Sequence, residues 1–98
     1  MDAIPTTVAR VAKELSLPVE GLMQRSLKAY LKQEIRAVQM DMTDFQDRYG
    51  VAKATELRER IKQGKIYSHP AWEDVIEWET LEAHLAHLQE LLPEVRDV

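Results

Sequence analysis

The stretch that decides the fold is PVEGLMQRSLKAYLKQEIRAVQMDMTDFQDRYG, which runs from Pro18 to Gly50. The apolar side chains of its second half are alternately four and three residues apart, which is the spacing of a heptad seam: Leu31, Ile35, Val38, Met42, Phe45 and Tyr49. Pro18 suits the first turn of a helix, and Gly50 suits the position after the last turn. The stretch therefore predicts one long helix over residues 18–49, about 48 Å long if unbroken. Thr43 and Asp44 favour helix starts and leave open a bend near Met42.

Shorter helices are predicted on both sides of this stretch, because apolar residues recur there with the period of a helix. A helix over about 5–15 has one apolar face, formed by Val8, Val11, Ala12 and Leu15. A helix over about 52–63 ends at Gly64. A last helix begins near Ser68 or His69, has Pro70 in its first turn and ends at Leu92 before Pro93.

The last helix carries a second heptad seam, formed by Trp78, Leu81, Leu85, Leu88 and Leu92. The sequence therefore predicts an all-α fold of about four helices with one long central helix. The two seams pair either within the chain, as a helical hairpin, or between chains, as a bundle. A chain of 98 residues buries only about 65% of the surface that its unfolded form exposes, so a dimer or a docked partner is expected.

Composition limits the class of protein. The chain has 45% hydrophobic and 31% charged residues, no cysteine and no long apolar run. No transmembrane helix, signal peptide or membrane partner is expected from this composition. The absence of cysteine rules out disulfides and thiolate chemistry within the chain, and it suits a reducing cytoplasm, which is the compartment we expect.

Charge divides the chain into two regions. Residues 1–40 carry six Lys or Arg against four acids, whereas residues 66–98 carry one base against eight acids. A basic front and an acidic rear suggest two contact surfaces. We therefore expect a helix-turn-long-helix dimerisation region over 1–49, with DNA contact as an added role, and an acidic helical partner-binding region over 50–98. Ordinary solvated helix faces would also explain these charges.

A line of basic side chains lies on one face of the predicted long helix: Arg25, Lys28, Lys32 and Arg36. Their spacing of three, four and four places them nearly opposite the apolar residues Met23, Leu27 and Tyr30. Such a line can follow a phosphate backbone, so these are the expected nucleic-acid contacts. The alternative is the exposed face of any soluble helix.

Two tryptophans lie in the acidic rear of the chain. Trp72 and Trp78 are six residues apart, and both are large apolar anchors that serve either a core or an interface. An acidic helix with tryptophan anchors suits a basic, partly apolar groove on another protein. The expected partner-binding residues are Trp72, Trp78, Leu81, Leu85 and Leu88.

Neither an enzyme nor a metal or cofactor site is expected. His84 and His87 have the helical spacing of metal ligands, but the sequence offers them no third ligand. Carboxylate pairs such as Glu73-Asp74 are better explained by a solvated helix face than by general acid–base catalysis. No glycine-rich phosphate loop or nucleophile elbow occurs.

The stretch Val8–Leu31 reads as an apolar helix, a turn and a second helix, through Val11-Ala12-Lys13-Glu14-Leu15, Ser16-Leu17-Pro18, Leu22-Met23, Leu27 and Ala29-Tyr30-Leu31. It resembles the two-helix part of ribbon-helix-helix proteins, the DNA-binding halves of many antitoxins. The resemblance implies a dimer that binds DNA through a ribbon before the first helix, where this chain has only Met1–Ile4. Other departures are Ser16 and Pro18 in the turn and Gly21 in place of a common acid.

The rear is similar to small antitoxin-like helical proteins through the run His69-Pro70-Ala71-Trp72-Glu73-Asp74 and through Glu77-Trp78-Glu79. That similarity implies a segment that covers the active surface of a toxin. The leading hypothesis is therefore an antitoxin-like protein that neutralises a toxin through its acidic rear and regulates its own gene by binding DNA. The alternative is a non-enzymatic helical adaptor or assembly subunit that binds no nucleic acid.

Overall fold

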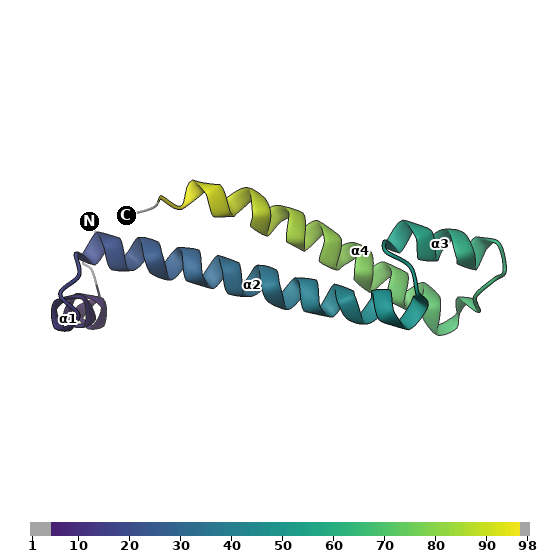
Figure 1. The fold of residues 1–98 in the computed structure, drawn as a ribbon, viewed down its shortest axis with the longest axis horizontal. Helices are drawn as coiled ribbons and strands as arrows, with labels where there is room; N and C mark the ends of the chain where they lie inside the picture. Colours follow the sequence, from purple (N-terminus) through teal and green to yellow (C-terminus); the bar gives the residue numbers. More distant parts are fainter. Residues whose placement is uncertain (1–4, 97–98) are drawn as a thin grey trace.

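The computed structural model describes residues 5–96, and the chain is all-α over this range, with no strand (Figure 1). Its elements are α1 (Thr6–Glu14), α2 (Val19–Tyr49), α3 (Ala54–Lys62), α4 (Ser68–Leu91) and the 3₁₀ turn η1 (Leu92–Glu94). The all-α class predicted from the sequence is confirmed. Met1–Ile4, the residues in the place of a DNA-reading ribbon, lie outside the described residues.

Helices α2 and α4 lie side by side and antiparallel, and they form a rod of 61 × 22 × 21 Å (Figure 1). The connection through α3 closes one end of this hairpin, and α3 packs against α4 there. At the other, open end, α1 crosses the start of α2 and η1 ends the return helix. The two heptad seams pair within the chain, because Val38 and Phe45 of α2 are buried on the same interface as Trp78 and Leu88 of α4.

Helix α2 is unbroken through Met42. Thr43 lies within the helix, and its hydroxyl donates a hydrogen bond of 2.9 Å back to the carbonyl of Gln39. The helix ends at Gly50, whose φ of +65° is left-handed and whose N–H donates to the carbonyl of Gln46 at 2.8 Å. Glycine adopts this conformation at little cost, which explains why α2 ends at Gly50, the residue predicted from the sequence.

The main core lies at the closed end and joins three helices. Its buried residues are Phe45, Val51, Ala54, Leu57, Ala71, Val75 and Trp78. The rings of Phe45 and Trp78 stack at 5.7 Å between centroids and at 17°. Residues from both sides of the expected boundary at Tyr49 therefore share one core.

Helix α4 contains one irregular residue, His69, with φ −118° and ψ 126°. Its regular turns begin at Pro70, which needs no hydrogen-bond acceptor at the start of a helix. Within the described residues, no helix has the length and apolar character that crossing a bilayer requires.

Candidate partner-binding surfaces

The five expected partner-binding residues do not form one surface. Trp78 is 0% exposed and Leu88 is 5% exposed, because both face α2 in the heptad seam. Leu81 and Leu85 are half-buried along the same seam. The prediction is corrected for Trp78 and Leu88, which no partner can reach without opening the hairpin. Trp72 keeps 39% of its surface exposed.

Trp72 is held in place by a contact between α3 and α4. The guanidinium carbon of Arg58 lies 4.8 Å from the centroid of the Trp72 ring. The same Arg58 donates hydrogen bonds to both carboxylate oxygens of Glu79, at 2.6 and 2.7 Å from its terminal nitrogen and at 3.2 Å from Nε. One face of the indole is therefore covered by Arg58, and the exposed part of the ring remains available to a partner.

Two further large apolar side chains are exposed in this part of the chain. Ile76 is four residues later on α4, and Tyr67 immediately precedes this helix with 92% of its surface exposed. We call Tyr67, Trp72 and Ile76 the closed-end surface. Exposed carboxylates of α4, Glu73 and Glu77, border it. The i, i+4 spacing of Trp72 and Ile76, opposite the seam, is a sequence signal that could have identified this surface.

A cluster of polar side chains fastens the end of α2 to α4. The carboxylate of Asp74 accepts a hydrogen bond from the hydroxyl of Tyr49. It also forms an ion pair with Arg48, whose terminal nitrogen lies 2.8 Å from the Asp74 oxygen. Burial raises the pKa of the Tyr49 hydroxyl, and the hydrogen bond to Asp74 raises it further. The hydrogen bond with Asp74 also raises the pKa of Arg48. Spacing could not have predicted this cluster, since its members are about 25 residues apart in sequence.

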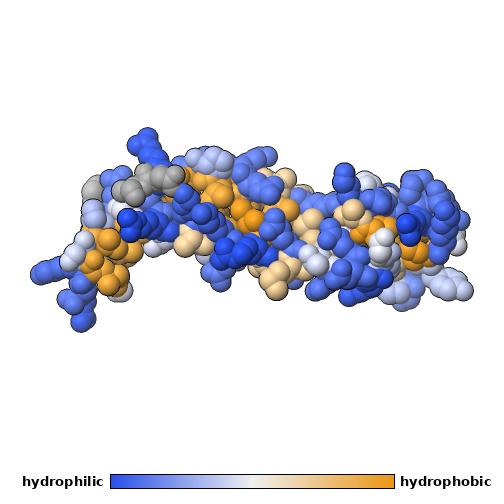
Figure 2. Space-filling view, in the orientation of Figure 1, coloured by the Kyte–Doolittle hydropathy of each residue, from blue (hydrophilic) through white to orange (hydrophobic). Residues whose placement is uncertain are grey.

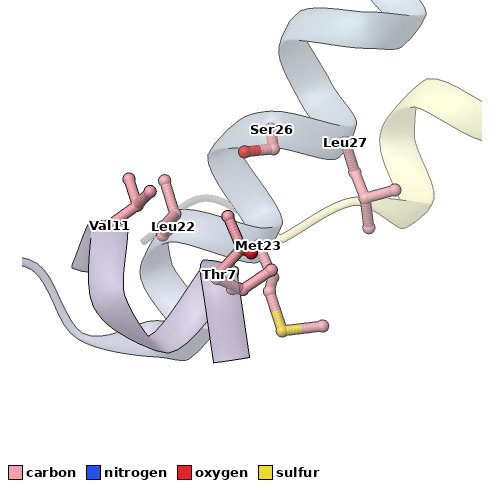
Figure 3. A pocket seen from close by; sticks show the side chains of 7 residues that line it. Thr7, Val11, Leu22, Met23, Ser26 and Leu27 are labelled. Atoms are coloured by element: carbon pink, nitrogen blue, oxygen red, sulfur yellow. The ribbon is translucent and has the colours of Figure 1, made fainter. Parts of the chain in front are cut away.

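The open end carries an apolar groove of about 450 Å³ between α1 and α2 (Figure 3). Its lining residues are Thr7, Val8, Val11, Leu22, Met23, Ser26 and Leu27. Figure 2 shows the same apolar character on the outer surface around α1. Val11, Leu15, Met23, Leu27 and Tyr30 are all exposed here, and we call these five residues the open-end surface. The sequence identified their apolar pattern but not its exposure.

A second hollow adjoins the groove and shares Leu27 with it. It lies between α2 and the end of the return helix and is lined by Gln24, Leu27, Tyr30, Leu31, Leu91, Glu94 and Val95. The backbone N–H of Arg96 donates to the side-chain oxygen of Gln24 at 3.2 Å, which holds the chain end against α2. The apolar surface at the open end is therefore continuous from α1 to η1.

The expected nucleic-acid contacts lie on one face of the unbroken helix α2. Arg25, Lys32 and Arg36 are exposed, and Lys28 is half-buried. From Arg25 to Arg36 the line extends about 16 Å along the helix.

His84 and His87 are both exposed on α4. Within residues 5–96, no group of three or more potential metal ligands comes together.

Comparison with known proteins supplies the family. Residues 1–97 match the model of the family described as "Uncharacterized protein MJ0235 family". This chain belongs to the MJ0235 family. No curated protein and no solved structure matches it. The description of the MJ0235 family states no activity.

Proposed function

We propose that this chain is an antitoxin-like protein that binds and neutralises a basic protein partner through the closed-end surface. The observation that carries the proposal is Trp72, which stays exposed on an acidic helix although the hairpin has buried Trp78. Exposed aromatic residues are the commonest anchors of protein interfaces. The acidic region 66–98, with one base against eight acids, would attract a basic partner and orient it.

Neutralisation would work by covering the active surface of the partner. Tyr67, Trp72 and Ile76 would enter apolar depressions on a toxin, while Glu73 and Glu77 would pair with its basic residues. Trp78 and Leu88 contribute only by keeping the hairpin closed. The proposal includes a cytoplasmic location, because a chain without cysteine suits a reducing compartment.

Co-expression with the product of the adjacent reading frame tests this proposal. Trp72→Ala combined with Ile76→Ala should abolish both the complex and the rescue of growth. Tyr30→Ala, an aromatic truncation at the open end, is the matched control and should leave both intact. Rescue that survives the double substitution at the closed end would refute the proposal.

DNA contact through Arg25, Lys28, Lys32 and Arg36 is a second part of the proposal. It is favoured by the placement of three exposed cations on one face of a continuous helix. In gel-shift titrations, Arg25→Ala with Lys32→Ala should reduce the salt slope of the binding constant by about 2. Arg60→Ala with Lys62→Ala, which removes equal charge from α3, should leave the slope unchanged. If no retardation occurs at low salt, the DNA role is excluded.

The alternative is a non-enzymatic helical adaptor or assembly subunit that does not bind nucleic acid. The open-end surface favours this function, because it offers a second apolar face toward the opposite end of the rod from the closed-end surface. An adaptor predicts partners at both ends and no effect of the adjacent gene product. The growth assay described above separates the two functions.

A further inference from the structure

The open end of the rod leaves its apolar side chains uncovered. Between residues 5 and 37 the only buried residues are Ala12 and Gly21, neither of which has a large side chain. Helix α1 has nine residues, and a helix of this length is marginal in water unless its apolar face is covered. The groove between α1 and α2, together with the exposed stripe of α2 from Met23 to Tyr30, would therefore be stabilised by a partner that covers it.

Carboxylates border the groove and the stripe. On α1, Glu14 is seven residues after Thr7, which lines the groove, so both side chains lie on the same face of the helix. On α2, Glu20 and Glu34 are each seven residues from Leu27, so they lie at the two ends of the stripe. Glu14 and Glu20 are exposed, and Glu34 is half-buried. The apolar surface therefore has an acidic border.

The exposed cations of this end lie on other faces of the same helices. On α1, Arg10 and Lys13 lie nearly opposite the apolar face. On α2, the line of basic side chains lies nearly opposite the stripe. Near the adjoining hollow, Glu94 and Arg96 carry opposite charges. A partner that approaches the groove therefore meets negative charge on both α1 and α2.

We propose that the open-end surface binds an amphipathic helix with basic flanks, whose apolar side chains enter the groove while its lysines or arginines pair with Glu14, Glu20 and Glu34. A helix satisfies its own backbone hydrogen bonds, whereas an extended segment needs partners for them. Among the described lining residues, the groove offers only the hydroxyls of Thr7 and Ser26. The stripe is about 11 Å long, so apolar residues at i, i+3 or i+4, and i+7 of a partner helix match its two turns.

The acidic border disfavours the other occupants of such a surface. Anionic lipid headgroups would be repelled by the carboxylates. A second copy of this chain would bring the same acidic border against itself, and like charges across an interface weaken it. Because the open-end surface is separate from the closed-end surface, binding here does not require the antitoxin role.

Fluorescence anisotropy with two labelled helical peptides of about 18 residues tests the proposal. Both peptides carry leucines in a heptad pattern, and the positions that flank the leucines are lysine in one peptide and glutamate in the other. The lysine peptide should bind the native chain with a Kd in the micromolar range, because a contact of roughly two turns is smaller than a standard interface. The glutamate peptide should bind about tenfold more weakly, and added salt should narrow this difference.

A matched pair of substitutions locates the peptide on the rod. Leu27 at the open end and Ile76 at the closed end are both 51% exposed, and a change to Asp adds the same charge at either site. Leu27→Asp should weaken binding of the lysine peptide by at least about tenfold, because it places a carboxylate in the centre of the apolar stripe. Ile76→Asp should leave the affinity unchanged.

A second pair of variants keeps the test decisive if Leu27→Asp does not fold. Glu14→Lys with Glu20→Lys leaves the apolar lining intact and should reverse the preference, so that the glutamate peptide binds more tightly. Glu73→Lys with Glu77→Lys makes the same change of charge at exposed positions of the closed end and should keep the preference for lysine. Far-UV circular dichroism checks that each variant keeps its helicity.

Several outcomes would overturn the proposal. Equal affinity for the two peptides, or no binding of either, would show that the acidic border selects no basic helix. Binding that is lost with Ile76→Asp and kept with Leu27→Asp would place the peptide on the closed-end surface, which would support the antitoxin proposal instead. A native dimer by light scattering that Leu27→Asp converts to a monomer would make a second copy the occupant. Binding to phosphatidylglycerol vesicles that is lost with Leu27→Asp would make a lipid surface the occupant.

Discussion

Asp74 joins the end of the long helix to the return helix by accepting hydrogen bonds from two consecutive residues, Tyr49 and Arg48. The guanidinium of Arg48 also lies 5.4 Å from the centroid of the Phe45 ring, so the cluster covers one side of the core. A single carboxylate thereby fixes the lateral position of α2 against α4 at the closed end. No ligand is needed to explain the cluster.

Removal of the Tyr49 hydroxyl tests this role. Tyr49→Phe should lower the free energy of unfolding by about 1 kcal/mol, the usual net contribution of a hydrogen bond. The pKa of Tyr49 is raised above its ordinary value of 10.0 in the folded state. Its contribution is therefore complete below pH 10 and is lost as the pH rises through the folded pKa. Urea titrations from neutral to alkaline pH should show a steeper loss of stability in the native chain than in Tyr49→Phe, and parallel curves would contradict this.

Trp72 and Trp78 differ sharply in burial, although the sequence predicts the same partner-binding role for both. Trp78→Ala should cost about 3–5 kcal/mol, because it empties the centre of the core. Trp72→Ala should cost about 1 kcal/mol, mainly the contact with Arg58. Within the described residues the indole N–H of Trp78 has no hydrogen-bond acceptor, so Trp78→Phe removes an unsatisfied donor and should cost less than about 2 kcal/mol. Equal losses for the two alanine variants in urea unfolding would contradict this assignment.

At the scale of the helices, the ends of α2 and the buried faces could be predicted, because they depend on local sequence signals. Gly50 and Pro18 mark the ends of α2, and the heptad spacings identify the faces that become buried. The sequence could not decide whether the seams pair within the chain or between chains, because periodicity defines a face but not its partner. The same limit explains the correction of Trp78 and Leu88, whose seam is satisfied by α2. Ile76 was missed because it lies outside the heptad seam, and only its i, i+4 spacing from Trp72 marks it.

Replacing Gly50, the residue at which α2 ends, should cost stability through the backbone conformation alone. No described atom lies within 4 Å of a Cβ placed on Gly50, so a substitution meets no steric clash and only the left-handed φ matters. Gly50→Ala should lower stability by about 1–2 kcal/mol. Gly50→Asn should cost less, since asparagine tolerates this conformation. Gln33→Ala, on an exposed face within α2, should be neutral or slightly stabilising, and an equal loss there would show that the backbone strain is not responsible.

At the scale of the whole molecule, the chain is a rod with an uneven core. Its radius of gyration is 19.8 Å, against about 13 Å for a compact domain of 100 residues. The charge division predicted from the sequence does not separate two packing units, because the core at the closed end takes Phe45 from the front region and Trp78 from the rear. The charge of a region determines what its surface attracts, whereas packing is determined by the apolar seams. In this chain the boundary between the charged regions therefore does not coincide with a boundary between packing units.

Cutting the chain at the expected boundary should therefore destroy the fold in both pieces. Fragment 1–49 keeps α1 and α2 but exposes the whole seam of α2, and fragment 50–98 loses the ring that stacks on Trp78. Neither fragment alone should show cooperative thermal unfolding by far-UV circular dichroism, since each is left with too little buried surface. An equimolar mixture should regain helicity beyond the sum of the two, because the seams can pair again. Mixtures in which fragment 50–98 carries Trp78→Ala should regain less than those carrying Trp72→Ala. If fragment 50–98 unfolds cooperatively by itself, the rear region is an independent domain and the shared core is not what holds the rod together.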